Sequence, residues 1–138
     1  LKPLDLIKPY RLEMGTRLSN QRGADLYDFW QVSLAKKLLE DLDSQPKPVL
    51  INLASNEYFK AVDVSALGHV QIINPVFKDT SNGRLKIISF FAKRARGAMA
   101  NFVIKQRIKQ PEQLKTFDTD GYQYQPELST ETDWVFAR

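Results

Sequence analysis

Val49-Leu50-Ile51-Asn52-Leu53-Ala54 is a short and nearly continuous apolar run. Runs of this kind are typical of a strand that is buried on both faces of a sheet. The polar residues Ser55-Asn56-Glu57 follow at once and predict a short helix that continues through Lys60. The run therefore predicts a buried strand that leads directly into a helix.

Upstream of this run, residues 25–42 predict an amphipathic helix. Its apolar residues recur every four positions, at Leu26, Trp30, Leu34, Leu38 and Leu42. Asp25 is the expected N-cap, because its carboxylate can accept a hydrogen bond from a free backbone N–H of the first turn. Pro46 and Pro48 mark the end of the segment.

Downstream, two further strands are expected, over 70–77 and 85–91. Pro75 lies within the first and predicts an edge strand or a broken one, because proline has no backbone N–H to donate. The pair Asn82-Gly83 predicts a tight turn between the two strands.

The last third of the chain predicts a second long helix over 93–108. Its apolar face is formed by Ala95, Met99, Phe102 and Val103. Pro111 is expected to begin a short third helix that runs through Phe117. Aromatic residues then alternate with polar ones in two stretches, at Tyr122 and Tyr124 and at Trp134 and Phe136, and predict a terminal antiparallel hairpin.

Strands and helices in mixed order predict an α/β fold, with a mixed sheet and flanking helices. The 138 residues correspond in length to one domain. The sequence starts without an initiator methionine, so we expect residues 1–138 to be a portion of a domain whose remaining strands are absent here.

The composition excludes several classes of site. The chain has no cysteine, which excludes disulfides, thiolate metal sites and thiol peroxidase chemistry. His69 is its one histidine, so no histidine-rich metal site can form. We assign no catalytic residue, metal or cofactor. No apolar run approaches the roughly 20 residues of a membrane span, and no signal peptide is evident, so a cytoplasmic location without membrane contact is expected.

Positive charge is concentrated in one segment, although the whole chain has only 20 Lys and Arg against 16 Asp and Glu. Between 84 and 115 the basic residues are Arg84, Lys86, Lys93, Arg94, Arg96, Lys105, Arg107, Lys109 and Lys115. Glu112 is the single acid in this segment. The segment is either a solvated basic helix or the contact surface for a polyanion.

The first candidate site is the junction at 91–97, between an expected strand and the expected helix. Lys93, Arg94 and Arg96 cluster there, at a helix N-terminus whose free N–H groups attract phosphate. The alternative is that these cations pair with surface carboxylates. Few acids lie nearby in the sequence, which favours a phosphate or nucleic-acid contact.

The second candidate is a helical hairpin over about 93–117, with its turn at 109–111. Lys105, Arg107, Lys109 and Lys115 surround this turn, and a helix-hairpin-helix module would hold the DNA backbone there through main-chain N–H groups. Such contacts read phosphate and not bases. The turn lacks the glycine that such modules usually have.

The third candidate is a ligand pocket where the strand at 49–54 ends. Asn52, Ser55 and Asn56 can bind phosphate or sugar there, and Glu57 can act as a general base. The alternative is structural: Ser55 or Asn56 caps the helix and Glu57 is a first-turn acid. Arg11 is assigned to the same pocket as a phosphate ligand, with pairing to Glu13 as its alternative.

Four long segments resemble the bacterial YaaA family, in the same order and over essentially the whole chain. They are residues 1–14 (LKPLDLIKPYRLEM), 25–30 (DLYDFW), 51–60 (INLASNEYFK) and 86–97 (KIISFFAKRARG). In that family this stretch is about the second half of the protein. The first half, which opens with a strand and a Ser-Pro-Ala-Lys motif, is absent here.

The resemblance implies a function that composition alone does not. YaaA-type proteins belong to the peroxide-stress response and limit the harm done by intracellular iron. Their α/β fold is expected to have a positively charged cleft and a helix-hairpin-helix element that bind duplex and branched DNA. Carried over by residue, the cleft includes Lys93, Arg94 and Arg96, and the hairpin is 93–117. With no cysteine and one histidine, any effect on iron is expected to be indirect or to depend on carboxylates.

Three functions therefore follow as hypotheses. The first is a non-catalytic DNA-binding protein that uses the basic segment. The second is an enzyme that processes a nucleotide or a nucleic acid, with its pocket at Asn52–Glu57. The third is a partner-binding module whose basic face meets an acidic protein. The oligomeric state does not follow from the sequence.

Overall fold

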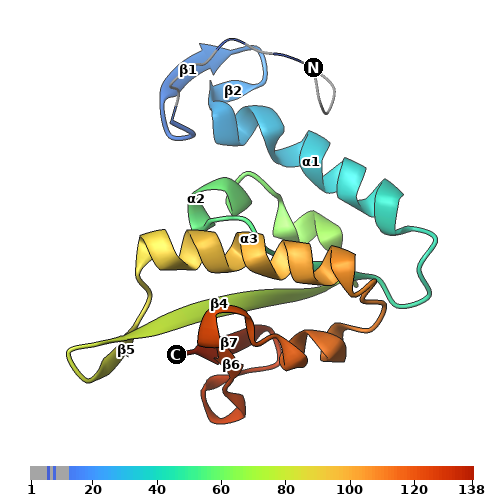
Figure 1. Cartoon of the computed structure of the whole chain (residues 1–138). Coiled ribbons are helices and arrows are strands. Elements are labelled where there is room, and N and C mark those ends of the chain that lie inside the picture. Colours follow the sequence, from blue (N-terminus) through green and yellow to red (C-terminus); the bar gives the residue numbers. More distant parts are fainter. Residues whose placement is uncertain (1–5, 7, 9–12) are drawn as a thin grey trace.

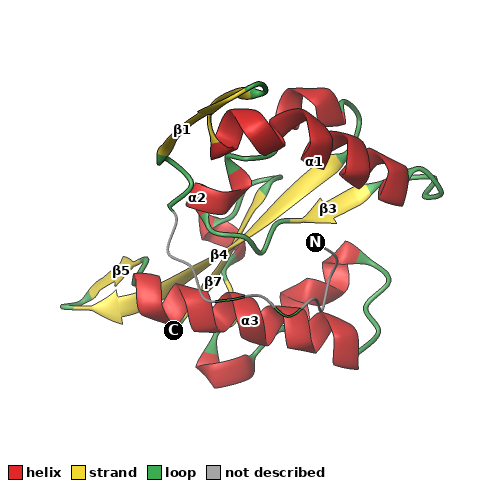
Figure 2. Ribbon diagram, turned by 90° about the horizontal axis from the view of Figure 1, so that it is seen from above, coloured by secondary structure: helices red, strands yellow, loops and turns green. Residues whose placement is uncertain are grey.

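The computed structural model describes residues 6, 8 and 13–138, and they form a mixed sheet with helices on both of its faces (Figures 1 and 2). The strands of this sheet are β3 (Val49–Ile51), β4 (Gln71–Ser81), β5 (Arg84–Lys86), β6 (Gln123–Tyr124) and β7 (Asp133–Ala137). Their order is β3-β4-β7-β6, and β5 also pairs with β4. The β3–β4 and β4–β7 pairs are parallel, whereas β5 and β6 pair antiparallel. The predicted α/β fold class is confirmed.

Two apolar cores lie on the two faces of the sheet, because successive side chains of β4 point in opposite directions. Ile73 and Phe77 pack against helix α3 (Ser89–Lys105) in the larger core, which also contains Met99, Leu114, Phe117 and Phe136. Ile72 packs with helix α1 (Leu26–Leu42) in the smaller core, where Ala35, Leu42, Leu67 and Val70 are buried.

The predicted helix over 25–42 is confirmed as α1, and Asp25 is its N-cap. The Asp25 carboxylate accepts a hydrogen bond of 3.0 Å from the backbone N–H of Asp28. A separate two-stranded hairpin, β1 (Arg17–Asn20) and β2 (Gly23–Asp25), leads into this helix.

The strand predicted at 49–54 is confirmed, but it is only three residues long and half-buried. Its two faces pack on the two cores, Val49 and Ile51 on the larger and Leu50 on the smaller, and its position at the edge of the sheet leaves it partly exposed. After it come α2 (Asn56–Phe59), as predicted, and the 3-10 segment η1 (Val64–Leu67).

Pro75 does not break β4, which continues from Gln71 to Ser81. The N–H groups of Asn74 and Thr80 donate to carbonyls on the β7 side, so the backbone nitrogen of Pro75 points to the opposite side. On that side β3 pairs with residues 71–73 and β5 with residues 79–81. Pro75 therefore lies in the gap between two strands, where no ladder donor is needed.

The turn predicted at Asn82-Gly83 is confirmed, and both residues have positive φ angles, of 52° and 70°. The strand predicted over 85–91 was wrong beyond Lys86, because α3 already begins at Ser89. Ala92, Ala95 and Met99 are buried at helical spacing, which turns Phe90 outward with 65% of its surface exposed. A strand-like composition at 87–91 was therefore overridden by packing of α3 on the sheet.

The helix-hairpin-helix element is not confirmed. After α3 the chain turns and forms η2 (Pro111–Thr116), a six-residue 3-10 segment, where a second α-helix was expected. Two shorter 3-10 segments, η3 (Thr119–Gly121) and η4 (Pro126–Leu128), flank β6. The predicted terminal hairpin is confirmed, since β6 and β7 pair with Tyr124 opposite Phe136. No helix in the described part of the chain is long and apolar enough to cross a membrane.

Candidate nucleic-acid interface

The solvent face of α3 carries the basic residues that the sequence analysis singled out. Because Ala92, Ala95 and Met99 hold one side of the helix against the sheet, Lys93, Arg94 and Lys105 are exposed on the other side. Arg96 lies on a flank and is half-buried. The helix has 17 residues, so this face is about 25 Å long.

No carboxylate in the described part of the chain forms an ion pair with these cations. Among residues 6, 8 and 13–138, the ion pairs within 4.0 Å are Lys36–Glu40, Lys37–Asp41 and Arg138–Asp79. None of them involves Lys93, Arg94, Arg96, Lys105, Arg107 or Lys109. The described carboxylates therefore leave the positive charge of α3 and the following turn uncompensated.

The cations do not surround the helix N-terminus as the sequence analysis had assumed. Because α3 begins at Ser89, Lys93, Arg94 and Arg96 lie in its second turn. The N–H of Ala92 already donates to the Ile88 carbonyl at 2.8 Å, so the free N–H groups belong to residues before the basic cluster. Any contact of this cluster with phosphate must use its side chains.

In the turn after α3, two backbone N–H groups form hydrogen bonds to a side chain of the adjoining segment η2. The N–H groups of Lys109 and Gln110 donate to Oε1 of Gln113, at 3.1 and 3.0 Å. Arg107 adopts a left-handed conformation with φ of 50° in the same turn. A helix-hairpin-helix module would offer such N–H groups to DNA, whereas here they are occupied and the side chains of Lys105, Arg107 and Lys109 are exposed.

Lys115 is half-buried and does not lie on the solvent face of α3. Its Nζ lies 4.5 Å from the ring centroid of Trp134 and 5.4 Å from that of Tyr124. These cation–π contacts attach η2 to the terminal hairpin.

Ser55 and Asn52, two residues of the pocket predicted at Asn52–Glu57, make local structural contacts. Ser55 caps α2 by accepting a hydrogen bond of 3.4 Å from the N–H of Tyr58. The Asn52 side chain donates to Oδ1 of Asn74 at 2.9 Å, and its own oxygen accepts from the N–H of Ala54. Asn56 and Glu57 are exposed on α2. Arg11 lies outside the described residues.

A polar chain runs from the end of β3 to the start of β7. Asn74 on β4 accepts from Asn52 and donates from Nδ2 to Oδ1 of Asp133, at 2.9 Å. The three side chains thus satisfy one another across three strands. Within the described residues, no three His, Asp or Glu side chains come together as a group that could hold a metal ion.

Sequence reasoning missed a buried polar cluster beneath the start of α3. Asp79 is 4% exposed and accepts hydrogen bonds from Tyr122 Oη at 2.9 Å and from Arg138 Nε at 2.6 Å. Burial of the phenol, followed by its hydrogen bond to Asp79, raises the pKa of Tyr122 to about 12. The sequence does contain a signal for the burial of Asp79. In a strand every second residue faces the same side, so Asp79 lies on the same face as Ile73 and Phe77, which pack in the core.

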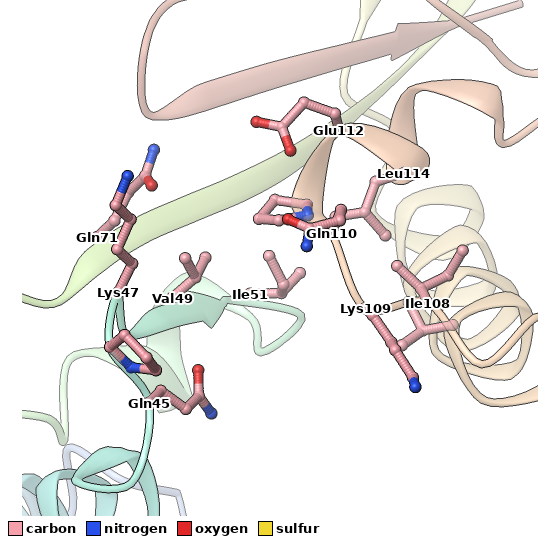
Figure 3. A pocket seen from close by; sticks show the side chains of 13 residues that line it. Gln45, Lys47, Val49, Ile51, Gln71, Ile108, Lys109, Gln110, Glu112 and Leu114 are labelled. Atoms are coloured by element: carbon pink, nitrogen blue, oxygen red, sulfur yellow. The ribbon is translucent and has the colours of Figure 1, made fainter.

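An open groove of about 870 Å³ lies between β3 and the C-terminal end of α3 (Figure 3). Val49 and Ile51 form its side on the sheet, and Val103, Ile108 and Leu114 lie across from them. Polar residues at its rim include Lys47, Lys109 and Glu112. This groove is separate from the outward face of α3.

Comparison with known proteins identifies the family. The family model described as peroxide stress protein YaaA matches residues 1–128. The chain is similar over all its 138 residues to proteins named UPF0246 from Hahella chejuensis (51% identical), Cellvibrio japonicus (53%) and Teredinibacter turnerae (56%). It covers 54%, 53% and 54% of these three proteins, and so spans about half the length of the curated relatives it matches. On this similarity, the chain belongs to the YaaA family of peroxide stress proteins.

Proposed function

We propose that the chain supplies a DNA-binding surface, formed by α3 and the turn that follows it, to a protein of the peroxide-stress response. The observation that carries this proposal is the row of cations on α3 that form no ion pair with any described residue. A polyanion is the partner that matches an extended array of uncompensated positive side chains.

Binding is expected to be independent of DNA sequence. Lysine and arginine side chains on an exposed helix face contact phosphate oxygens, which carry no information about bases. The backbone N–H groups of the turn at 109–110 are occupied by Gln113, so the side chains must provide most of the attraction. Release of counterions from the DNA then makes the affinity strongly dependent on salt.

Two apolar side chains lie among these cations and add a second kind of contact. Phe90 and Ile104 are 65% and 74% exposed on the outward side of α3. An exposed aromatic ring can stack on an unpaired base, whereas a closed duplex offers none. We therefore expect branched DNA with unpaired bases at its branch point to bind more tightly than duplex DNA. By covering DNA in the cytoplasm, the protein would shield it from damage by iron and peroxide, without a metal site of its own.

The proposal is tested by measuring affinity for duplex and four-way-junction DNA across a salt series. The variant Lys93→Glu, Arg94→Glu, Arg96→Glu is expected to weaken binding to all sequences alike. The matched control is Lys36→Glu, Lys37→Glu on α1, where the lysines are already paired with Glu40 and Asp41. Binding that survives the triple change undiminished, in a folded protein, would refute the α3 surface as the site.

A further inference from the structure

The outer edge of β3 has backbone groups that no described strand pairs with. The carbonyl of Pro48 accepts from Gln71 and the N–H of Asn52 donates to Ile73, so alternate residues of β3 bond to β4. Backbone groups alternate in direction along a strand, and those of Val49 and Ile51 therefore point to the opposite edge. β3 is one of the two terminal strands in the order β3-β4-β7-β6, so this edge is open within the described part of the chain.

The groove shown in Figure 3 lies beside the same edge and is apolar at its base. Val49 and Ile51 are half-buried against the larger core and face Val103 and Ile108 across the groove. A strand added at the edge of β3 would direct every second side chain into this groove. One occupant thus satisfies both the open hydrogen-bond donors and the uncovered apolar side chains.

The lengths of the relatives indicate where such a strand comes from. The chain covers only 53–54% of proteins that match it from end to end, so each relative has nearly as many residues again outside the match. In each of these three relatives the residues outside the match are part of the same polypeptide as the groove. Every copy of the groove therefore has one copy of these residues attached to it. An isolated edge of this kind is also prone to unwanted pairing when left uncovered.

We propose that the edge of β3 and the adjoining groove are the docking site for a β-strand from the half of the family's proteins that this chain does not match. The added strand hydrogen-bonds to Val49 and Ile51 and extends the sheet beyond β3. The proposed docking site adjoins the proposed DNA-binding surface at the turn after α3, where Lys109 lines the groove, but Lys93, Arg94, Arg96 and Lys105 of α3 do not line it.

The decisive measurement is hydrogen exchange of backbone amides in the full-length Teredinibacter turnerae relative and in the present chain alone. The amides at the positions of Val49 and Ile51 are expected to exchange at least about 100-fold more slowly in the full-length protein. The amide of Leu50 points toward β4 and serves as the internal control, because it has its partner in both proteins.

Three results would overturn the proposal. If the amides at the two positions exchange equally fast in both proteins, no strand covers the edge. Protection already present in the isolated chain would place the occupant within these 138 residues. Protection that appears only in a dimer, as shown by sedimentation, would identify a second copy as the occupant.

A variant pair tests the groove in a hybrid, in which this chain replaces the matching half of the Teredinibacter turnerae protein. Val103→Asp places a charge in the groove and is expected to lower the hybrid's Tm by at least about 5 °C more than that of the isolated chain. Val32→Asp is the matched control, since Val32 is an exposed valine on α1. Equal effects of Val103→Asp in the hybrid and in the isolated chain would contradict the proposal.

Discussion

Tyr122 and Asp79 form a buried hydrogen bond of 2.9 Å, from the phenol Oη to the carboxylate Oδ2, between residues that are 43 positions apart. Arg138 completes the cluster, since its Nε donates to the other carboxylate oxygen and its guanidinium lies over the rings of Phe91 and Tyr122. A buried carboxylate is tolerated because both of its oxygens have donors. The cluster ties β4, α3 and the end of β7 to one another.

Replacement of Asp79 by alanine is expected to lower the free energy of unfolding by about 3 kcal/mol, because it leaves the Tyr122 and Arg138 donors without their acceptor. Asp79→Asn keeps an acceptor oxygen and should cost less. Urea denaturation of both variants measures the difference. A loss below about 0.5 kcal/mol for Asp79→Ala would show that the cluster does not support the fold.

Stability is expected to fall as pH rises from about 10 to about 12. The folded protein holds the Tyr122 proton to about pH 12, whereas the unfolded chain releases it near the ordinary value of 10.0. The stabilising contribution is thus complete below pH 10 and is lost through this window, by about 2–3 kcal/mol. In Tyr122→Phe the loss of stability between pH 10 and pH 12 that is due to this phenol should vanish. A titration of the native protein, followed by tyrosinate absorbance, should show one tyrosine that ionises near pH 12.

The salt dependence of DNA binding should report how many phosphates α3 contacts. Each of Lys93→Gln, Arg94→Gln and Lys105→Gln is expected to reduce the slope of log affinity against log salt by up to about 0.9. The reduction should be the same on two DNA duplexes of unrelated sequence. Lys36→Gln on α1 provides the comparison, and a slope that changes as much there would mean that the charge effect is not local.

Gln113→Ala separates side-chain binding from binding by the turn's backbone. The change frees the N–H groups of Lys109 and Gln110 and is expected to cost about 1 kcal/mol of stability, while affinity for DNA stays the same. A gain in affinity would instead show that these amides can reach phosphate, as in a helix-hairpin-helix module. Thermal denaturation and DNA titration on one preparation give both numbers.

Lys115 and Lys105 provide a matched pair of lysines with opposite expected behaviour. Lys115→Gln removes the cation from the Trp134 and Tyr124 rings, so we expect a loss of about 0.5–1 kcal/mol in stability and a change in tryptophan fluorescence. DNA affinity should not change. Lys105→Gln should weaken DNA binding and leave stability unchanged. Weaker DNA binding by Lys115→Gln would place Lys115 on the binding surface.

Elements with a strong local signal could be predicted from the sequence. The four-residue repeat of α1 with its Asp25 cap, the Asn82-Gly83 turn and the aromatic terminal hairpin are all present as predicted. Each is encoded by residues close together in the chain, through periodicity, capping or a left-handed turn.

Features that depend on distant contacts could not be predicted in this way. Phe90 and Phe91 have strand-like composition, but packing of Ala92, Ala95 and Met99 on the sheet makes the segment helical. The role of Gln113 in the turn and of Arg138 beside Asp79 follows only from the folded chain. The basic residues of the candidate interface were evident from the sequence, whereas their place in the second turn of α3 depended on where the helix starts.

Pro75 has a consequence for how this molecule avoids fibril-like association. The gap on the edge of β4 between β3 and β5 would otherwise be a short template on which another chain could add a strand. A residue without an N–H cannot donate to such a strand, and its ring occupies the space that the strand would need. Intermolecular pairing through β4 is therefore disfavoured at this gap, although the strands on either side of it, β3 and β5, are both short.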